Sequence, residues 1–148
     1  MNKEEVHLQC LHLVQQKLAA AESAIREAQL AANDETKSSA GDKYETGRAM
    51  MHLEQEKQAS QRSTAQRQLQ ALHQINSKQT THRVGPGSLV KTNEGYFYLA
   101  AGLGKITVGD ATCFVISTVA PLGQAMQDKQ SGEEIQLNGR IIRINDVC

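Results

Sequence analysis

Four acidic side chains gather within twelve consecutive positions of the chain, where two lysines accompany them. Carboxylate oxygens are ligands that Mg²⁺ prefers, and one or two suffice when another macromolecule supplies the rest. Acids around helix ends are also common as solvated caps that interact with the helix dipole, so both interpretations stay open here. The four residues are Asp34, Glu35, Asp42 and Glu45.

Other chemically active residue types do not form a catalytic constellation in the sequence. The five histidines show no H-E-x-x-H or Cys/His metal spacing, and no G-x-S-x-G occurs. Segment 102–105 only partly resembles a phosphate-binding loop, because Leu99 replaces its first glycine and Ile106 its hydroxyl residue. We therefore expect a chain that is not itself an enzyme and has no cofactor of its own.

Composition and charge exclude several classes of protein. Sixteen basic and sixteen acidic residues are interleaved along the 148-residue chain, which does not favour a nucleic-acid or membrane surface. No apolar run is long enough for a membrane span or a signal peptide. Three cysteines without C-x-x-C spacing fit reduced thiols. We expect a soluble, cytoplasmic protein.

The elements that must position the acids fall into two halves of different composition. Aromatic residues make up 3% of the chain, too few for one compact core of this size. No proline and two of the eleven glycines precede Thr80, whereas both prolines and nine glycines follow it. This shift predicts two domains, residues 1–78 and 79–148.

The first half predicts an antiparallel helical hairpin. Apolar residues of its first stretch alternate in steps of three and four, which is typical of a helix packed on another helix. A polar segment, 33–41, then separates it from a second helical stretch, 42–76, on whose apolar stripe Gln58 and Arg62 also fall. Some 32 residues make an arm about 45–50 Å long. The seam residues are Leu11, Val14, Leu18, Ala21, Ile25, Ala28 and Ala32.

The second half predicts a small antiparallel sheet that carries one helix. Short β-branched or aromatic runs at 88–92, 96–99, 105–108, 112–117, 134–137 and 140–144 are bounded by glycine-containing turns. The dipeptide Asn138-Gly139 favours a type I′ hairpin turn. Pro121 stands at the first position of an expected short helix, 121–127.

Residues 116–134, ISTVAPLGQAMQDKQSGEE, resemble the C-terminal domain of the bacterial GreA/GreB transcript cleavage factors. The shared features are an Ile-Ser pair, a Pro-Leu-Gly run, an alanine and a Lys-x-x-Gly-acid pattern, in this order. Segment 84–90, VGPGSLV, resembles the opening strand of the same domain, and residues 44–48 resemble the helix that follows the family's tip. The resemblance is specific over 84–146 and loose over the arm.

The resemblance implies a partner and a mechanism. The family's C-terminal domain is FKBP-like and docks on RNA polymerase, while its coiled coil enters the secondary channel. Acids at the tip help to bind a Mg²⁺ ion shared with the polymerase, which then cleaves its own backtracked RNA. For docking, the resemblance points to Pro121, Leu122 and Gly123, although proline and glycine there could equally shape the turn into the helix.

The tip acids of the family can be aligned with this chain in more than one way. Alignment on Gly41-Asp42 gives Asp42 and Glu45 the family's spacing of three, and Asp34 with Glu35 is a further candidate pair. Alignment on Tyr44 instead places Lys37 and Ala40 there. A non-cleaving regulator that occupies the channel is therefore an alternative.

Two other classes of protein are weighed against the resemblance. A coiled-coil scaffold could dimerise through the seam between Leu11 and Ile25 without binding polymerase, although a monomer is favoured. An FKBP-like prolyl isomerase is disfavoured because two Phe, three Tyr and no Trp leave little for an aromatic pocket.

Overall fold

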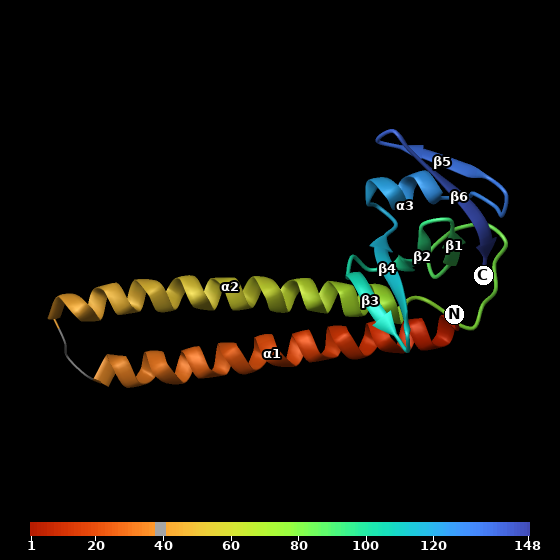
Figure 1. The fold of residues 1–148 in the computed structure, drawn as a ribbon. Coiled ribbons are helices and arrows are strands. Elements are labelled where there is room, and N and C mark those ends of the chain that lie inside the picture. Colours follow the sequence, from red (N-terminus) through yellow and green to blue (C-terminus); the bar gives the residue numbers. More distant parts are fainter. Residues whose placement is uncertain (38–40) are drawn as a thin grey trace. The chain divides into compact units, whose positions relative to one another are not determined.

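The computed structural model describes the backbone of residues 1–37 and 41–148, and their side chains except those of 32, 34–37 and 41–45. Two long helices come first, and strands with one short helix follow (Figure 1). This arrangement confirms the predicted fold class. The helices are α1 (Lys3–Lys37), α2 (Gly41–His73) and α3 (Pro121–Met126), and the strands are β1 (Leu89–Thr92), β2 (Gly95–Ala100), β3 (Gly104–Val108), β4 (Ala111–Ser117), β5 (Glu134–Leu137) and β6 (Arg140–Val147).

The chain divides into two compact units. The first, which we call the arm unit, is Leu13–Arg67. The second, the base unit, combines Met1–His12 with Gln68–Cys148. The first turns of α1 and the last turn of α2 therefore belong to the same unit as the sheet.

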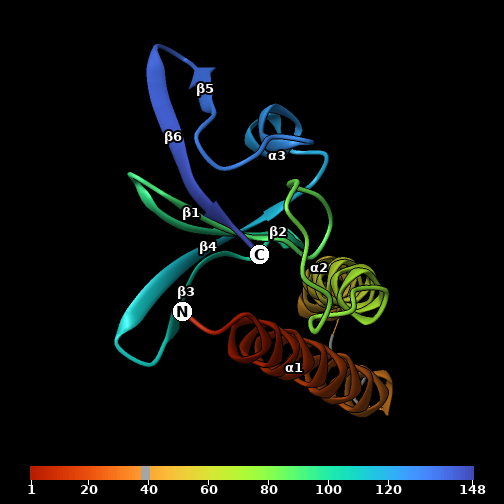
Figure 2. The same cartoon turned by 90° about the vertical axis from the view of Figure 1, so that its right-hand side faces the viewer.

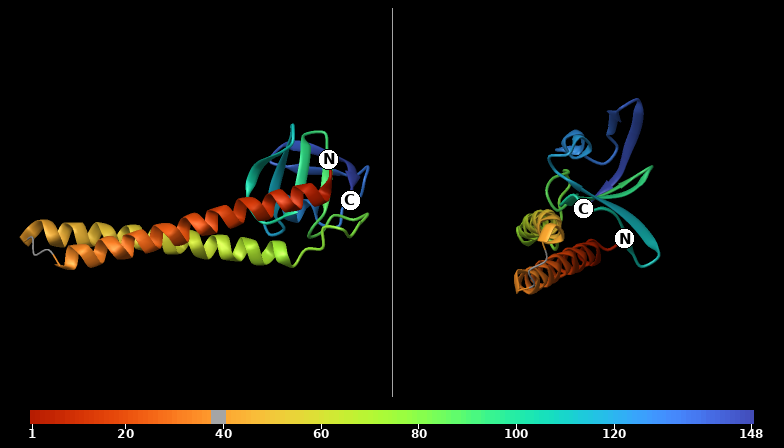
Figure 3. Two further views of the ribbon diagram at one scale, coloured as in Figure 1. Left: turned by 90° about the horizontal axis from the view of Figure 1, so that it is seen from below. Right: turned by 90° about the vertical axis from the view of Figure 1, so that its left-hand side faces the viewer.

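In the arm unit, α1 and α2 run side by side in opposite directions (Figures 1 and 3). Val14 and Ala21 of α1 are buried and Leu18 is half-buried, as the alternating steps of three and four predict. On α2, Ala65 is buried, whereas Arg62 is exposed and Gln58 half-buried, so the polar positions of that stripe are not part of the buried seam. Because this burial arises within one chain, the seam is occupied by the hairpin itself.

The long helices differ from the prediction near their junction. Helix α1 continues through residues 33–37, which were expected to connect the helices, and Gly41 begins α2 instead of ending α1. The physical reason is that 33–37 contain neither glycine nor proline, so no residue there ends a helix. At the other end of α1, the side-chain oxygen of Asn2 accepts hydrogen bonds from the amides of Glu4 (2.8 Å) and Glu5 (3.4 Å) and caps the helix.

The base unit contains a six-stranded sheet in the order β3-β4-β2-β1-β6-β5, as far as the chain is described. All neighbours are antiparallel except β2 and β4, which pair in parallel with Tyr96 opposite Cys113 and Leu99 opposite Ile116. The sheet is therefore mainly antiparallel, as predicted, with one parallel pair that the sequence did not indicate. Strand β3 lies at the sheet edge, and β4 returns between β3 and β2, so it runs in the direction of β2.

The two faces of the sheet carry different packing. Helix α3 covers one face (Figure 2), where Met126 is fully buried against Phe97, Leu99 and Ile144. Side chains that alternate with these, among them Leu89 and Tyr98, point to the other face. Asn138 and Gly139 both have positive φ (53° and 76°), which confirms the predicted type I′ turn between β5 and β6.

Candidate functional site

The acidic positions lie at the end of the arm where the two long helices meet. Asp34 and Glu35 belong to the last turn of α1, and Asp42 and Glu45 to the first turns of α2. The backbone thus brings all four positions to one end of the hairpin, with 42 and 45 about one helical turn apart. Their side chains lie outside the described residues, so their role as metal ligands stays a prediction.

The residues predicted for docking have different environments around the start of α3. Gly123 is buried, and a Cβ atom there would overlap the carbonyl oxygen of Ser117. Leu122 is half-buried and packs against the core under α3. Packing therefore accounts for both residues, whereas Pro121 is exposed at the first turn of α3. Docking through these residues stays a prediction.

Val119 is a surface residue that the sequence reasoning did not single out. It lies in the turn between β4 and α3, and its side chain is 74% exposed. Together with Pro121, it exposes apolar surface to water at the start of α3. The sequence signal that could have identified this residue is a valine in a turn, outside any strand or helix pattern.

Three contacts anchor the ends of the arm helices within the base unit. Lys3 Nζ of α1 donates a hydrogen bond to the carbonyl oxygen of Gln79 (2.5 Å), and Gln68 Nε2 of α2 donates one to that of Gly102 (3.2 Å). Burial lowers the pKa of Lys3, while electrostatic attraction to Cys148 offsets part of this effect. These two contacts link the base-unit ends of both helices to the loop residues Gln79 and Gly102.

The third contact is a buried pair of rings. His7 Nδ1 of α1 lies 2.8 Å from the hydroxyl oxygen of Tyr98 on β2, and the rings meet edge to face at 6.0 Å. Burial and, to a lesser degree, the nearby His73 lower the pKa of His7. Burial raises the pKa of the Tyr98 hydroxyl. A neutral imidazole and a neutral phenol therefore share this hydrogen bond.

Two thiols near this pair are poorly suited to act as nucleophiles or metal ligands. Cys10 and Cys113 are buried, and burial raises the pKa of each to about 12. A thiolate, which is the reactive and metal-binding form, is therefore disfavoured at both positions. Among the described side chains, no group of three or more His, Cys, Asp or Glu residues could hold a metal ion. In the same part of the chain, no helix has the length and apolar character needed to cross a membrane.

Comparisons with known proteins give one likeness. No protein-family model matches the chain, and no curated protein matches it. The chain is similar to the crystal structure of GreA factor homolog 1 of Thermus thermophilus, with a TM-score of 0.33 and 13% sequence identity, over 93% of this chain and 94% of that chain. Because the TM-score and the identity are so low, we infer neither a function nor a site from this likeness.

Proposed function

We propose that this chain is a Gre-like transcription elongation factor. Its base unit binds RNA polymerase, and its arm carries acidic residues into the polymerase's secondary channel. The factor is not an enzyme by itself: it stimulates the polymerase to cleave backtracked RNA, or modulates the active site without cleavage. The proposal rests on the resemblance of residues 84–90 and 116–134 to the GreA/GreB family, together with the architecture of the chain.

The hairpin is the observation that carries the proposal. Helices of 35 and 33 residues are each about 50 Å long, and four acidic positions lie at the end of the hairpin where the two helices meet. An arm that only dimerised would need an apolar seam free for a second chain. Here the seam residues Val14 and Ala21 are buried within the single chain, which favours a hairpin that packs on itself over one that dimerises.

The resembling segment also forms one local structure in the base unit. Residues 116–134 run from the end of β4 through α3 to the start of β5. Within it, the close approach of Gly123 to Ser117 requires a residue without a side chain. Both residues belong to the Ile-Ser and Pro-Leu-Gly features that resemble the family, so in this chain the resembling pattern corresponds to one tight turn. This supports the family assignment, from which polymerase binding is inferred.

The acids at the tip would act together with the polymerase. Carboxylates at positions 34, 35, 42 and 45 would lend oxygen ligands to a Mg²⁺ ion that both proteins hold. Such an ion, when bound, polarises a phosphate and lowers the pKa of a water ligand. The chain's own contribution would be to deliver and orient these carboxylates, because the two helices carry all four positions at one end of the hairpin.

RNA cleavage in stalled, backtracked polymerase complexes tests this proposal. The wild type is compared with a variant that carries Asp42→Asn and Glu45→Gln, and with the control Glu56→Gln, an exposed acid of the arm. We expect Mg²⁺-dependent RNA shortening that the double variant loses and the control keeps. Binding without cleavage would identify a channel-occupying regulator, and absence of binding would contradict the proposal.

A further inference from the structure

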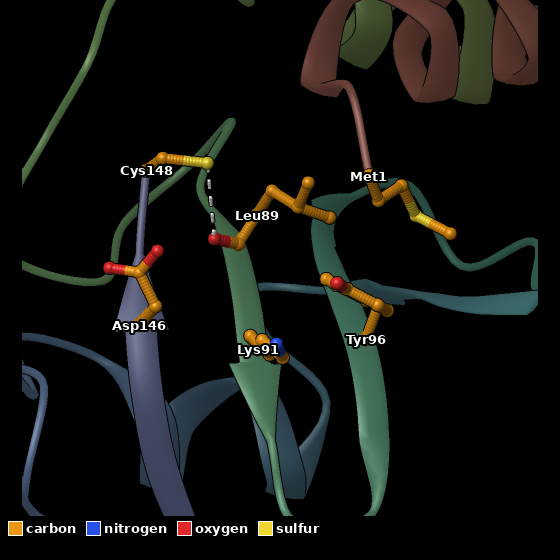
Figure 4. A pocket seen from close by; sticks show the side chains of 6 residues that line it. All are labelled: Met1, Leu89, Lys91, Tyr96, Asp146 and Cys148. Atoms are coloured by element: carbon orange, nitrogen blue, oxygen red, sulfur yellow. Dashed lines mark hydrogen bonds between the residues drawn. The ribbon is translucent and has the colours of Figure 1, made fainter. Parts of the chain in front are cut away.

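A small pocket lies on the sheet across β1, β2 and β6, and Figure 4 shows the residues that line it. Its floor is Leu89 and Lys91 of β1, which alternate with Val90 of the core under α3. The pocket has a volume of about 160 Å³. At about 30 Å³ for each water in the liquid, this is room for about five waters. The lining residues are Met1, Leu89, Lys91, Tyr96, Asp146 and Cys148.

One side of the pocket carries both signs of charge. Lys91 is the register partner of Tyr96 on β2 and of Asp146 on β6, so a basic residue stands between a tyrosine and an acidic residue across the three strands. Figure 4 shows these three side chains in one row across the strands. In the part of the chain that the structure describes, neither Lys91 nor Asp146 belongs to an ion pair. Both charges are therefore open to a ligand.

The other side of the pocket is less polar. Leu89 is 3% exposed, and Met1 lies above the strand that carries Tyr96 (Figure 4). The Cys148 thiol donates to the carbonyl oxygen of Leu89 (3.7 Å), which orients its sulfur at this end. A ligand with two charged groups close together and a short apolar tail would match both sides. The volume is well below the 300 Å³ or more of a typical drug-sized site, so the pocket suits a small ligand better than a nucleotide or a larger cofactor.

We propose that this pocket binds a small zwitterion, namely a free α-amino acid with an aliphatic side chain. Lys91 and the Tyr96 hydroxyl donate hydrogen bonds to the ligand's carboxylate, and Asp146 accepts from its ammonium group. The aliphatic tail lies against Leu89 and Met1. All of the lining residues belong to the base unit, and none of them belongs to the start of α3 that is proposed to dock on the polymerase.

Titration of the full-length chain with L-leucine, followed by amide chemical shifts, tests the proposal. We expect a dissociation constant on the order of millimolar, because the pocket is small and open, with shifts centred on residues 89–96 and 146–148. Lys91→Gln and Asp146→Asn should each weaken leucine binding about tenfold, as loss of one charge-assisted hydrogen bond does. The matched control Lys105→Gln, on the edge strand β3, should leave it unchanged.

Leucine analogues test the contributions of the ligand's carboxylate and ammonium group one at a time. Leucinamide lacks the carboxylate, so Lys91→Gln should not affect its binding, whereas Asp146→Asn should. N-acetylleucine lacks the ammonium and should show the reverse pattern. Absence of shifts with leucine, or equal affinity of the wild type for leucine and both analogues, would overturn the proposal. The comparison of ligands on the wild type decides the question even if a variant does not fold.

Discussion

His7 and Tyr98, 91 positions apart in the chain, share a buried hydrogen bond of 2.8 Å between the first turns of α1 and the middle of β2. This pair joins the start of the arm's first helix to the sheet within the base unit, and Val6 and Cys10 of the same helix are fully buried. Its partners are both polar groups removed from water, so each depends on the other for its hydrogen bond.

Removal of the Tyr98 hydroxyl should therefore destabilise the protein. Tyr98→Phe leaves the Nδ1 atom of His7 buried without a partner, which costs about 1–3 kcal/mol of unfolding free energy. The matched control is Tyr96→Phe, because Tyr96 is half-buried beside solvent. Urea denaturation monitored by circular dichroism measures both. Equal unfolding free energies for the two variants would contradict the importance of the pair.

Stability should also fall in mild acid because of His7. Burial holds the pKa of its imidazole below the ordinary value of 6.5, so below that pH the unfolded chain binds a proton that the folded chain does not. The free energy of unfolding is thus unaffected at high pH, falls as the pH drops through about 6.5, and levels off below the folded pKa.

Denaturation at several pH values between about 8 and 5.5 measures this loss. His7→Gln should reduce the slope over that range, whereas His12→Gln, at an exposed position of the same helix, should retain it. An unchanged slope in His7→Gln would mean that another group causes the loss.

Gly123 should tolerate no side chain. In Gly123→Ala, the new Cβ atom would overlap the backbone carbonyl of Ser117, so α3 or the end of β4 must shift. Such overpacking costs about 1–3 kcal/mol. Gly102→Ala is the matched control, since no atom lies within 4 Å of a Cβ at that position. Thermal unfolding should separate the two variants, and similar midpoints would argue against the close approach.

Val119 should contribute to polymerase binding without contributing to folding. Its side chain is 74% exposed, so Val119→Ser should leave the unfolding free energy within about 0.5 kcal/mol of the wild type. If the start of α3 docks on the polymerase, the same change should weaken binding about tenfold. Ile141→Ser, at a 56% exposed position of β6, is the control for exposed apolar residues elsewhere. Unaltered binding in Val119→Ser would exclude this surface.

The three thiols should differ in reactivity with a thiol reagent. Burial raises the pKa of Cys10 and Cys113 to about 12, so their thiolates are scarce, and their side chains are shielded as well. Cys148 is half-buried and should react first in the folded protein. Mass spectrometry after brief labelling counts the modified thiols. Rapid modification of Cys10 or Cys113 under folding conditions would show that α1 leaves the sheet readily.

Local patterns predicted most of the elements. The steps of three and four from Leu11 to Ala28 reflect burial of one helix face, which needs only a neighbouring helix. The strand ends agree with the structure to within a few residues, because glycines and Asn138-Gly139 fix the turns locally. The hairpin and the β-rich half could therefore be predicted without knowledge of distant contacts.

The features that the sequence did not indicate depend on contacts between residues that are far apart in the chain. The parallel pairing of β2 with β4 arises because β3 crosses to the sheet edge, which no turn signal records. The bond between His7 and Tyr98 joins two positions whose local patterns are an ordinary helix and an ordinary strand. Of the candidate site, the sequence identified the acidic positions, whereas the structure provided the packing roles of Leu122 and Gly123 and the exposure of Val119.

The most direct test of the central claim is photo-crosslinking from the arm to RNA polymerase. A photoreactive amino acid replaces Arg48, which is exposed near the acidic end of α2, and a second variant carries it at Glu133, exposed in the base unit. We predict that position 48 crosslinks to polymerase residues that line the secondary channel, and position 133 only to the outer surface. Crosslinks from position 48 to a second copy of this chain, with none to polymerase, would contradict the account.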